Sequence, residues 1–211
     1  MTLEQRLLSA WTGRGVLART LLPLSLVYRA LLDLDRARQH RKRLAREATS
    51  TPLRAPVVVI GNLVAGGAGK TPTVIATTRL LREHGFTPGI VSRGHGRSDP
   101  DTMFEVTANS DPRQAGDEPL LLRLRTMAPL VVGRDRNAAC AELLRLHPEV
   151  DVIVSDDGLQ HHALRPDVAV IVFDDRGAGN GWLLPAGPLR EPMPSRLSAC
   201  QLVIYNADRP S

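Results

Sequence analysis

Short apolar runs alternate with longer amphipathic stretches along most of the chain. Runs rich in Val, Ile and Leu predict strands at residues 56–60, 89–92, 103–106, 129–132, 151–154, 168–173 and 201–205. The stretches between them predict helices at residues 72–84, 117–126 and 135–146. Strands that are apolar throughout and separated by helices indicate a mostly parallel sheet with helices on both faces, an α/β fold.

The N-terminal residues follow a different pattern, in which apolar residues recur at helical spacing. Leu17, Leu21, Leu24, Tyr28 and Leu31 are separated by steps of four, three, four and three, which places them on one face of a helix. Dense positive charge follows at once, in the sequence RARQHRKR. No apolar run is long enough for a transmembrane helix.

An apolar stripe followed by positive charge is typical of a helix that lies in the headgroup region of an anionic membrane leaflet. The alternative is an amphipathic helix that packs on the protein's own core and carries a solvated basic extension. We therefore expect two parts: a basic, membrane-associating segment over residues 1–48 and a compact core over residues 49–211.

Charge is divided unevenly between these two parts. The 211-residue chain has a formal net charge of +5, but its first 50 residues hold ten basic and four acidic side chains. The other 161 residues hold 17 basic and 18 acidic side chains, a net charge of −1. Localised positive charge and an aromatic content of only 3% argue against a nucleic-acid partner and for a local anionic one. No obligate protein partner is indicated.

One glycine-rich stretch carries the clearest chemistry. From Val59 to Pro72 the chain reads VIGNLVAGGAGKTP, a strand that breaks into glycines and ends in Gly-Lys-Thr before a helix. Backbone N–H groups of such a loop surround nucleotide phosphates, Lys70 reaches the outer phosphates, and the Thr71 hydroxyl binds Mg²⁺. Val64 holds the position where the strict pattern has its first glycine, so the alternative is a glycine-rich turn that merely precedes Lys-Thr.

We interpret the stretch as a phosphate-binding loop, and the fold class as a P-loop NTPase-like sheet preceded by an N-terminal amphipathic helix. The predicted ATP-binding residues are Val64, Ala65, Gly66, Gly67, Ala68, Gly69, Lys70 and Thr71. A base-reading N-K-x-D motif, which GTP specificity normally requires, is missing from the sequence.

Acidic residues follow the strand at 151–154. Asp156 and Asp157 stand where nucleotide hydrolases and kinases place the carboxylate that holds Mg²⁺, although Asp-Gly is also a common turn pair. His161 and His162 come next and are candidate substrate-binding groups.

Two further motifs have both a functional and a purely structural interpretation. Arg93, in SRGHGR, can bind phosphate bidentately, or it belongs to a solvated basic loop. Asp117 and Glu118 open a predicted helix, where acids favour the helix dipole. The alternative is that Asp117 accepts the proton of an attacking hydroxyl, as phosphoryl transfer requires.

The chain carries GNLVAGGAGKTP, SRGHGR, GDEPLLL, VVGRDR, SDDGLQHH and GNGWLLPAGPLREP in that order. In order and spacing these motifs resemble the tetraacyldisaccharide 4′-kinase family, the lipid A kinases. The family usually reads GGTGKTP where this chain has Ala68, and SRGYG where it has His95. The resemblance covers essentially the whole chain.

The resemblance implies transfer of the ATP γ-phosphate to the 4′-hydroxyl of a tetraacyldisaccharide 1-phosphate, which gives lipid IVA. The implied cofactors are ATP and Mg²⁺. The implied partners are the acylated disaccharide lipid and the anionic surface of the inner leaflet. The implied location is peripheral, at the cytoplasmic face of the bacterial inner membrane.

Roles carry over from the family by position. Asp117 matches the proposed base and acts with Lys70 at the transferred phosphate. The implied metal-binding residues are Thr71, Glu118, Asp156 and Asp157. The implied substrate-binding residues are Arg93, Arg134 with the segment to Arg136, His161 and His162.

The chain differs from the family in length, because members carry a second, smaller domain after the strand equivalent to residues 201–205. A histidine in that domain is thought to assist the base, and it has no counterpart here. The chain is then either a fragment or a truncated, nucleotide-binding, membrane-attached module with little turnover. Another P-loop small-molecule kinase is a further alternative. We expect ATP binding to survive better than transfer.

Overall fold

The computed structural model describes residues 8–47, 52–67, 69–159, 164–193 and 200–207. Its centre is a seven-stranded sheet in the order β3-β4-β2-β5-β1-β6-β7. Neighbouring strands are parallel except β3 and β4. The strands are β1 (Val57–Gly61), β2 (Pro88–Ser92), β3 (Phe104–Glu105), β4 (Leu130–Val132), β5 (Val152–Asp156), β6 (Val168–Asp174) and β7 (Gln201–Asn206). The predicted mostly parallel sheet is confirmed, and each predicted strand lies within two residues of its expected bounds.

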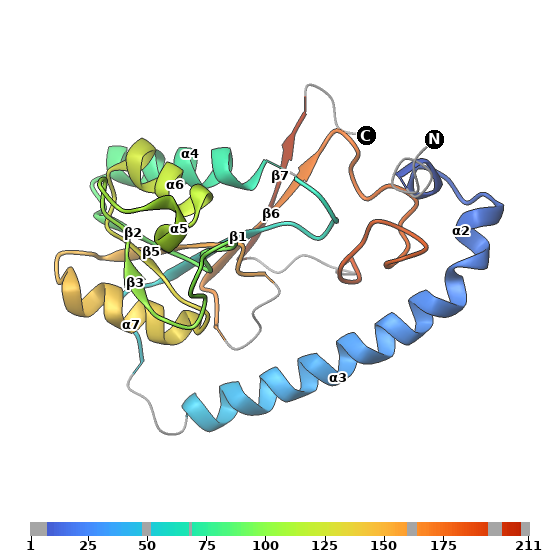
Figure 1. Ribbon diagram of the computed structural model, residues 1–211, viewed down its shortest axis with the longest axis horizontal. Helices are drawn as coiled ribbons and strands as arrows, with labels where there is room; N and C mark the ends of the chain where they lie inside the picture. Colours follow the sequence, from blue (N-terminus) through green and yellow to red (C-terminus); the bar gives the residue numbers. More distant parts are fainter. Residues whose placement is uncertain (1–7, 48–51, 68, 160–163, 194–199, 208–211) are drawn as a thin grey trace.

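Helices cover both faces of this sheet, as the sequence predicted. The core helices are α4 (Lys70–Glu83), α5 (Pro112–Ala115), α6 (Asp117–Thr126) and α7 (Arg136–Leu146). Helices α4 and α6 lie on one face and α7 lies on the other (Figure 1). Helix α7 begins after Asp135, whose carboxylate accepts the backbone N–H groups of Asn137 and Ala138.

The two faces of the sheet bury separate apolar layers. Val57 and Val59 of β1 pack with Leu143 of α7 on one face. Ile60 packs with Val74 of α4 and Leu122 of α6 on the other. Because successive strand residues point to opposite faces, a strand between two helical layers must be apolar at nearly every position.

The N-terminal residues form α2 (Val16–Thr20) and the long α3 (Leu22–Glu47). In Figure 1, α3 runs along one side of the molecule, apart from the sheet and its helices. None of the described helices combines the length and the apolar character that crossing a membrane would need.

The residues of the apolar stripe predicted for this segment are divided among α2, α3 and the turn residue between them, and they differ in burial. Ser25 is buried and Tyr28 is half-buried, and both contact residues that follow β6. Leu17, Leu24 and Leu31 are exposed. The expected helix is present, but the side that meets the protein is more polar than the periodicity of the leucines suggested.

Candidate active site

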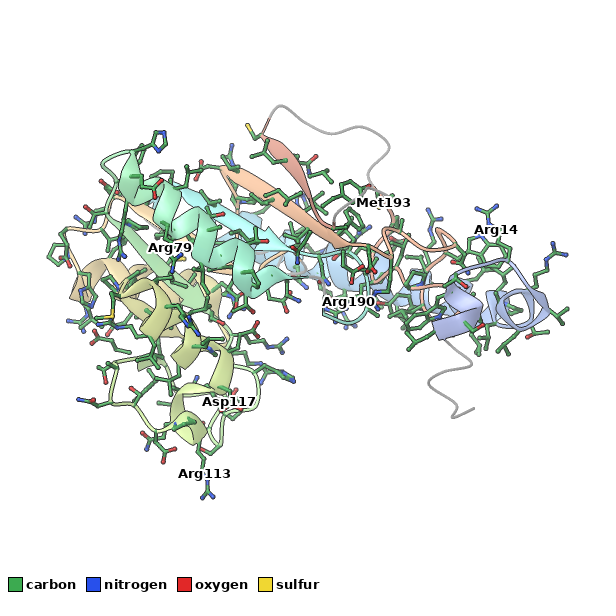
Figure 2. The ribbon with its side chains drawn as sticks, turned by 90° about the horizontal axis from the view of Figure 1, so that it is seen from above. Arg14, Arg79, Arg113, Asp117, Arg190 and Met193 are labelled. Carbon is green, nitrogen blue, oxygen red and sulfur yellow. The ribbon has the colours of Figure 1, made fainter. Side chains whose placement is uncertain are left out.

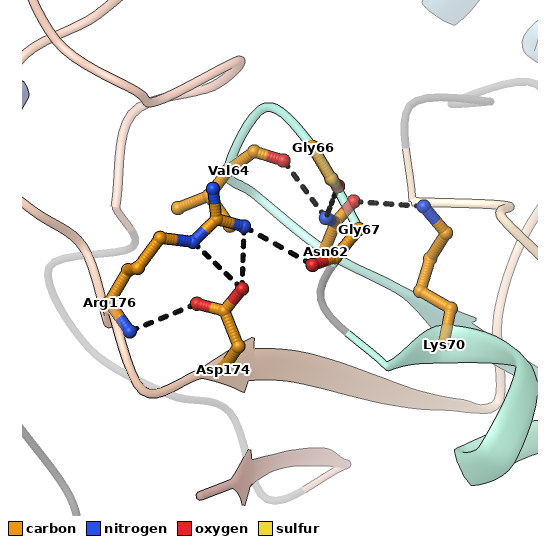
Figure 3. A network of polar contacts seen from close by, with 7 residues as sticks. All are labelled: Asn62, Val64, Gly66, Gly67, Lys70, Asp174 and Arg176. Atoms are coloured by element: carbon orange, nitrogen blue, oxygen red, sulfur yellow. Dashed lines mark hydrogen bonds and ion pairs between the residues drawn. The ribbon is translucent and has the colours of Figure 1, made fainter. Parts of the chain in front are cut away.

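The loop between β1 and α4 is organised from inside by a buried asparagine. The Asn62 side chain is fully buried, and its Nδ2 donates to the carbonyl oxygens of Val64 (2.9 Å) and Gly66 (3.1 Å). Its Oδ1 accepts a hydrogen bond from Lys70 Nζ at 3.3 Å. Figure 3 shows these contacts on the inner side of the loop. One amide group therefore fixes both the loop backbone and the lysine.

The loop residue before α4 has a backbone conformation that favours glycine. Gly69 has a φ of 78°, in the left-handed region, and caps the N-terminus of α4. A Cβ atom at this position would lie 2.1 Å from Nδ2 of Asn206, at the end of β7. The loop thus leads into an N-terminus whose free N–H groups attract anions. Ala68 lies outside the described residues.

Two side chains at the start of α4 connect the loop to neighbouring elements. Lys70 Nζ lies 3.3 Å from Oδ1 of Asp157, directly after β5. The Thr71 hydroxyl donates to Oε1 of Glu118, in the first turn of α6. Asp117, one residue earlier, is exposed at the same helix start. The structure thus brings together five of the residues singled out from the sequence.

Asp156, the last residue of β5, is the most deeply buried acid of this cluster. It is 2% exposed, and its Oδ2 accepts a hydrogen bond from Ser92 Oγ at 3.0 Å. Its Oδ1 is buried and has no hydrogen-bond partner within the described part of the chain. Burial raises the pKa of this carboxyl to about 6, and the negative charge of Glu118 is the next largest cause.

A buried arginine supports the same strand end. Arg136 is 2% exposed, and its guanidinium donates to the backbone carbonyls of Gly133 (2.9 Å) and Asp156 (3.2 Å). Its positive charge therefore lies near the carboxylates of Asp156 and Asp157. Because Asp157 has a φ of 51°, the chain turns sharply there.

A cleft of about 570 Å³ lies between α3 and this end of the sheet. Arg93 and Arg134, both singled out from the sequence, line it together with Arg136 and Arg190. Figure 2 shows Arg190 between the sheet core and the N-terminal residues around Arg14. Asp157 reaches the same cleft, so the arginines and the phosphate-binding loop share one site.

The sequence did not single out Asn62 or Arg190 as site residues, and two residues that it did single out fall outside the described part of the chain. The asparagine stands directly after a strand, which is the one signal that pointed to it. Arg190 lay in a quoted motif, but nothing in the sequence placed it opposite Arg93. His161 and His162 lie outside the described residues.

Comparison with known proteins agrees with this geometry. The sequence matches the family model "Tetraacyldisaccharide-1-P 4′-kinase" over residues 17–211. The tetraacyldisaccharide 4′-kinase of Methylibium petroleiphilum is 57% identical over 99% of this chain and 57% of its own length. The enzyme of the same name from Leptothrix cholodnii is 52% identical over 99% of this chain and 59% of its own length.

A solved structure is similar as well. LpxK from Aquifex aeolicus, determined in complex with ATP, is 30% identical with a TM-score of 0.67, over 84% of this chain and 55% of that one. The present chain thus spans less than two thirds of the length of these relatives. By its sequence and its fold, the chain belongs to the tetraacyldisaccharide-1-P 4′-kinase family.

Proposed function

We propose that this chain carries the kinase site that transfers the γ-phosphate of ATP to the 4′-hydroxyl of a tetraacyldisaccharide 1-phosphate, forming lipid IVA. The contact between Thr71 and Glu118 supports this most directly. It holds the start of α6, and with it Asp117, against the loop that would bind the triphosphate. Phosphoryl transfer requires the general base to lie close to the γ-phosphate that is transferred.

The phosphate-binding loop is the proposed ATP site. The loop, the left-handed Gly69 and the N-terminus of α4 form an anion-binding turn, and Lys70 adds a cation that Asn62 holds in place. The similar structure from Aquifex aeolicus was determined with ATP. We infer that residues Val64 to Thr71 bind the triphosphate here.

The acids around this loop fit a magnesium ion that is shared with the nucleotide. Asp156 offers a buried carboxylate oxygen without a partner among the described residues, and Thr71 offers its hydroxyl. Within the described residues, no group of three His, Cys, Asp or Glu side chains is placed to hold a metal alone. Mg²⁺ needs only one or two carboxylates when phosphates and water complete its shell. Glu118 and Asp157 complete the proposed set; bound Mg²⁺ would neutralise charge on the β- and γ-phosphates.

The proposed chemistry is a single in-line displacement. The acceptor oxygen forms a bond to the γ-phosphorus while the bond from that phosphorus to the β-phosphate oxygen breaks, and ADP leaves. Asp117 accepts the proton of the acceptor hydroxyl. Lys70, already oriented by Asn62 and Asp157, balances the negative charge on the transferred group.

The arginine-lined cleft and α3 fit an acidic lipid acceptor. Arg93, Arg134 and Arg190 would bind the phosphorylated disaccharide, while the buried Arg136 supports the strand end beside them. The exposed leucines of α3 would enter the acyl-chain region. We therefore propose a peripheral protein on the cytoplasmic face of the inner membrane. Its positively charged N-terminal segment would face the anionic leaflet.

The test is transfer of label from γ-labelled ATP to the acylated disaccharide 1-phosphate in mixed micelles. We expect labelled lipid to form, and Asp117→Asn to reduce its formation about 100-fold or more while ATP affinity stays within about twofold. Glu83→Gln removes an exposed carboxylate at the end of α4 and serves as the matched control.

ATP binding without transfer would favour the alternative, a nucleotide-binding, membrane-attached module. Labelling of small soluble alcohols in preference to the lipid would exclude the proposed acceptor.

A further inference from the structure

Residues Asp174 to Glu191, which we call the bridging segment, lie between α3 and the phosphate-binding loop. The backbone N–H of Arg190 donates to the carbonyl of Leu63 at 2.7 Å, and the N–H of Ala65 donates to the carbonyl of Pro188 at 2.8 Å. Val64 and Leu189 form an isolated antiparallel bridge between these bonds. The first half of the loop is therefore paired with the bridging segment as in a short strand pair.

A second tether reaches the loop from the start of the bridging segment. The Arg176 guanidinium donates to the carbonyl of Gly67 at 3.2 Å and is held by Asp174, to which its Nε donates at 2.9 Å. Figure 3 shows this pair on the side of the loop opposite Lys70. Both halves of the described loop backbone are thus fixed by residues that follow β6.

On its other side, the bridging segment is held by α3. Ser25 Oγ donates to the carbonyl of Leu183 at 2.9 Å and accepts the N–H of Ala186 at 3.0 Å. This serine is only 5% exposed, so water cannot readily replace either bond. Tyr28 adds a hydrogen bond from its hydroxyl to the Arg190 carbonyl at 3.0 Å.

The partners of Ser25 connect directly to the residues that pair with the loop. Leu183 accepts the N–H of Gly187 at 2.9 Å, and Leu184 donates to Leu189 at 2.9 Å. These bonds close the segment into a compact turn. A displacement of its α3-facing side must therefore move its loop-facing side as well.

We propose that Ser25 is a positioning residue for nucleotide binding, acting through the bridging segment on Leu63 to Ala65. This inference rests on the proposed function, since it makes the docking of α3 influence the proposed ATP site. Coupling of this kind is reciprocal: what strengthens α3 docking strengthens nucleotide binding, and nucleotide binding strengthens α3 docking.

The experiment compares Ser25→Ala and Ser25→Thr with the wild-type chain in detergent micelles. Residue-resolved amide exchange reports on the loop without nucleotide, and equilibrium titration gives the ATP affinity. In Ser25→Ala we expect exchange at Ala65 and Arg190 to rise about tenfold and the Kd for ATP to rise about threefold to tenfold. Ser25→Thr keeps the hydroxyl and should recover most of the exchange protection and most of the ATP affinity.

Thr20→Ala is the matched control, because the exposed Thr20 hydroxyl donates within α2, to the carbonyl of Leu17, and not to the bridging segment. It should change neither measurement. If Ser25→Ala does not fold, Tyr28→Phe removes the neighbouring hydrogen bond to Arg190 and takes its place. Saturating ATP should also slow exchange at the Ala186 amide, which Ser25 holds.

Unchanged exchange at Ala65 and Arg190 in a folded Ser25→Ala protein would overturn the inference, whatever the ATP titration gave. A wild-type chain that does not bind ATP would instead contradict the proposed function. The exchange comparison would then still decide whether α3 docking controls the loop.

Discussion

At the scale of single residues, the site contains two buried polar side chains, one fully hydrogen-bonded and one with an unpaired oxygen among the described residues. Asn62 uses both ends of its amide, so its burial is compensated by hydrogen bonds. Asp156 is buried with one oxygen that has no partner in the described part of the chain. The first residue stabilises the loop, whereas the second carries a cost that a bound cation would relieve.

Replacing Asn62 by alanine should damage the loop without removing any group that would touch ATP. Two backbone carbonyls lose the side-chain amide that donates to them, and Lys70 loses its hydrogen bond to Asn62 Oδ1 while keeping its contact with Asp157. We expect ATP affinity to fall about tenfold or more, and the free energy of unfolding to fall by about 1–3 kcal/mol. Titration and urea denaturation measure these. Asn109→Ala, in an exposed turn, is the control, and equal losses there would refute this role.

Replacing Asp156 by asparagine should stabilise the nucleotide-free protein at pH 8 and impair the metal-dependent binding of ATP. The folded-state pKa of about 6 is raised above the unfolded value, so the stability contribution is present at acid pH and is lost as pH rises through 6. We expect Asp156→Asn to be roughly 1–3 kcal/mol more stable than wild type at pH 8, with the difference shrinking toward pH 4. Urea denaturation at both pH values, with Glu83→Gln as control, measures it. An equally large difference at pH 4 and pH 8 would contradict this assignment.

The structure brings together mainly those candidate residues whose signals are local in sequence. Lys70 and Thr71 stand directly after the glycine-rich loop, and Asp156 ends a strand whose apolar run is unmistakable. Asn62 could not be assigned a role, because its partners depend on the path of a loop that bends back on itself. The structure brings the predicted acids together, but their roles in catalysis remain predictions.

At the scale of elements, α3 has one side that contacts the protein and another that is exposed to solvent. One side docks on the bridging segment through Ser25 and Tyr28. The other exposes Leu24 at 56% and Leu31 at 61%. Leucine periodicity in the sequence could not separate them, because buried contacts of α3 are largely polar and its largest apolar side chains face outward.

This division predicts that membrane binding and loop geometry can be changed independently. The double variant Leu24→Glu, Leu31→Glu places charge on the exposed side and should reduce binding to vesicles of anionic lipid about tenfold or more. Its ATP affinity should match that of wild type. Vesicle co-sedimentation measures the first and titration the second. Undiminished sedimentation would leave α3 with no role as the membrane-binding element.

At the scale of the whole molecule, contacts cross the boundary expected near residue 48. Asn180 Nδ2 donates to the carbonyls of Ala10 and Gly13, and its backbone N–H donates to the carbonyl of Trp11 at 2.7 Å. Arg36 pairs with the buried Glu191 at 2.7 Å. The N-terminal segment is thus built into the structure around the bridging segment.

Deleting residues 1–47 should therefore destabilise the remaining protein. Glu191 and Asn180 would lose hydrogen-bond partners that the N-terminal segment supplies, and surface that this segment now covers would be exposed to water. We expect the melting temperature to fall by at least about 5 °C. Differential scanning calorimetry in detergent measures this. A deletion protein with the same melting temperature as the wild-type chain would show that the N-terminal segment does not stabilise the rest of the protein.

The overall fold was predictable because its information is local: apolar runs mark buried parallel strands, and Asp135 marks a helix start. The path of the bridging segment could not be predicted from the sequence. Its bonds to α3 join residues more than 150 positions apart, and its own residues have no periodic pattern. Irregular backbone is positioned by such distant partners, so its path cannot be inferred from neighbouring residues.

The length of α3 has a consequence for geometry. A helix of 26 residues extends for about 39 Å at a rise of 1.5 Å per residue. Ser25, Tyr28 and Arg36 bind α3 to the bridging segment at three points, so the helix keeps a fixed orientation relative to the rest of the structure. If it rests in the plane of a bilayer, the residues of the proposed site lie at one fixed height above the lipid headgroups. That height would decide which hydroxyl of an embedded sugar the proposed site can reach.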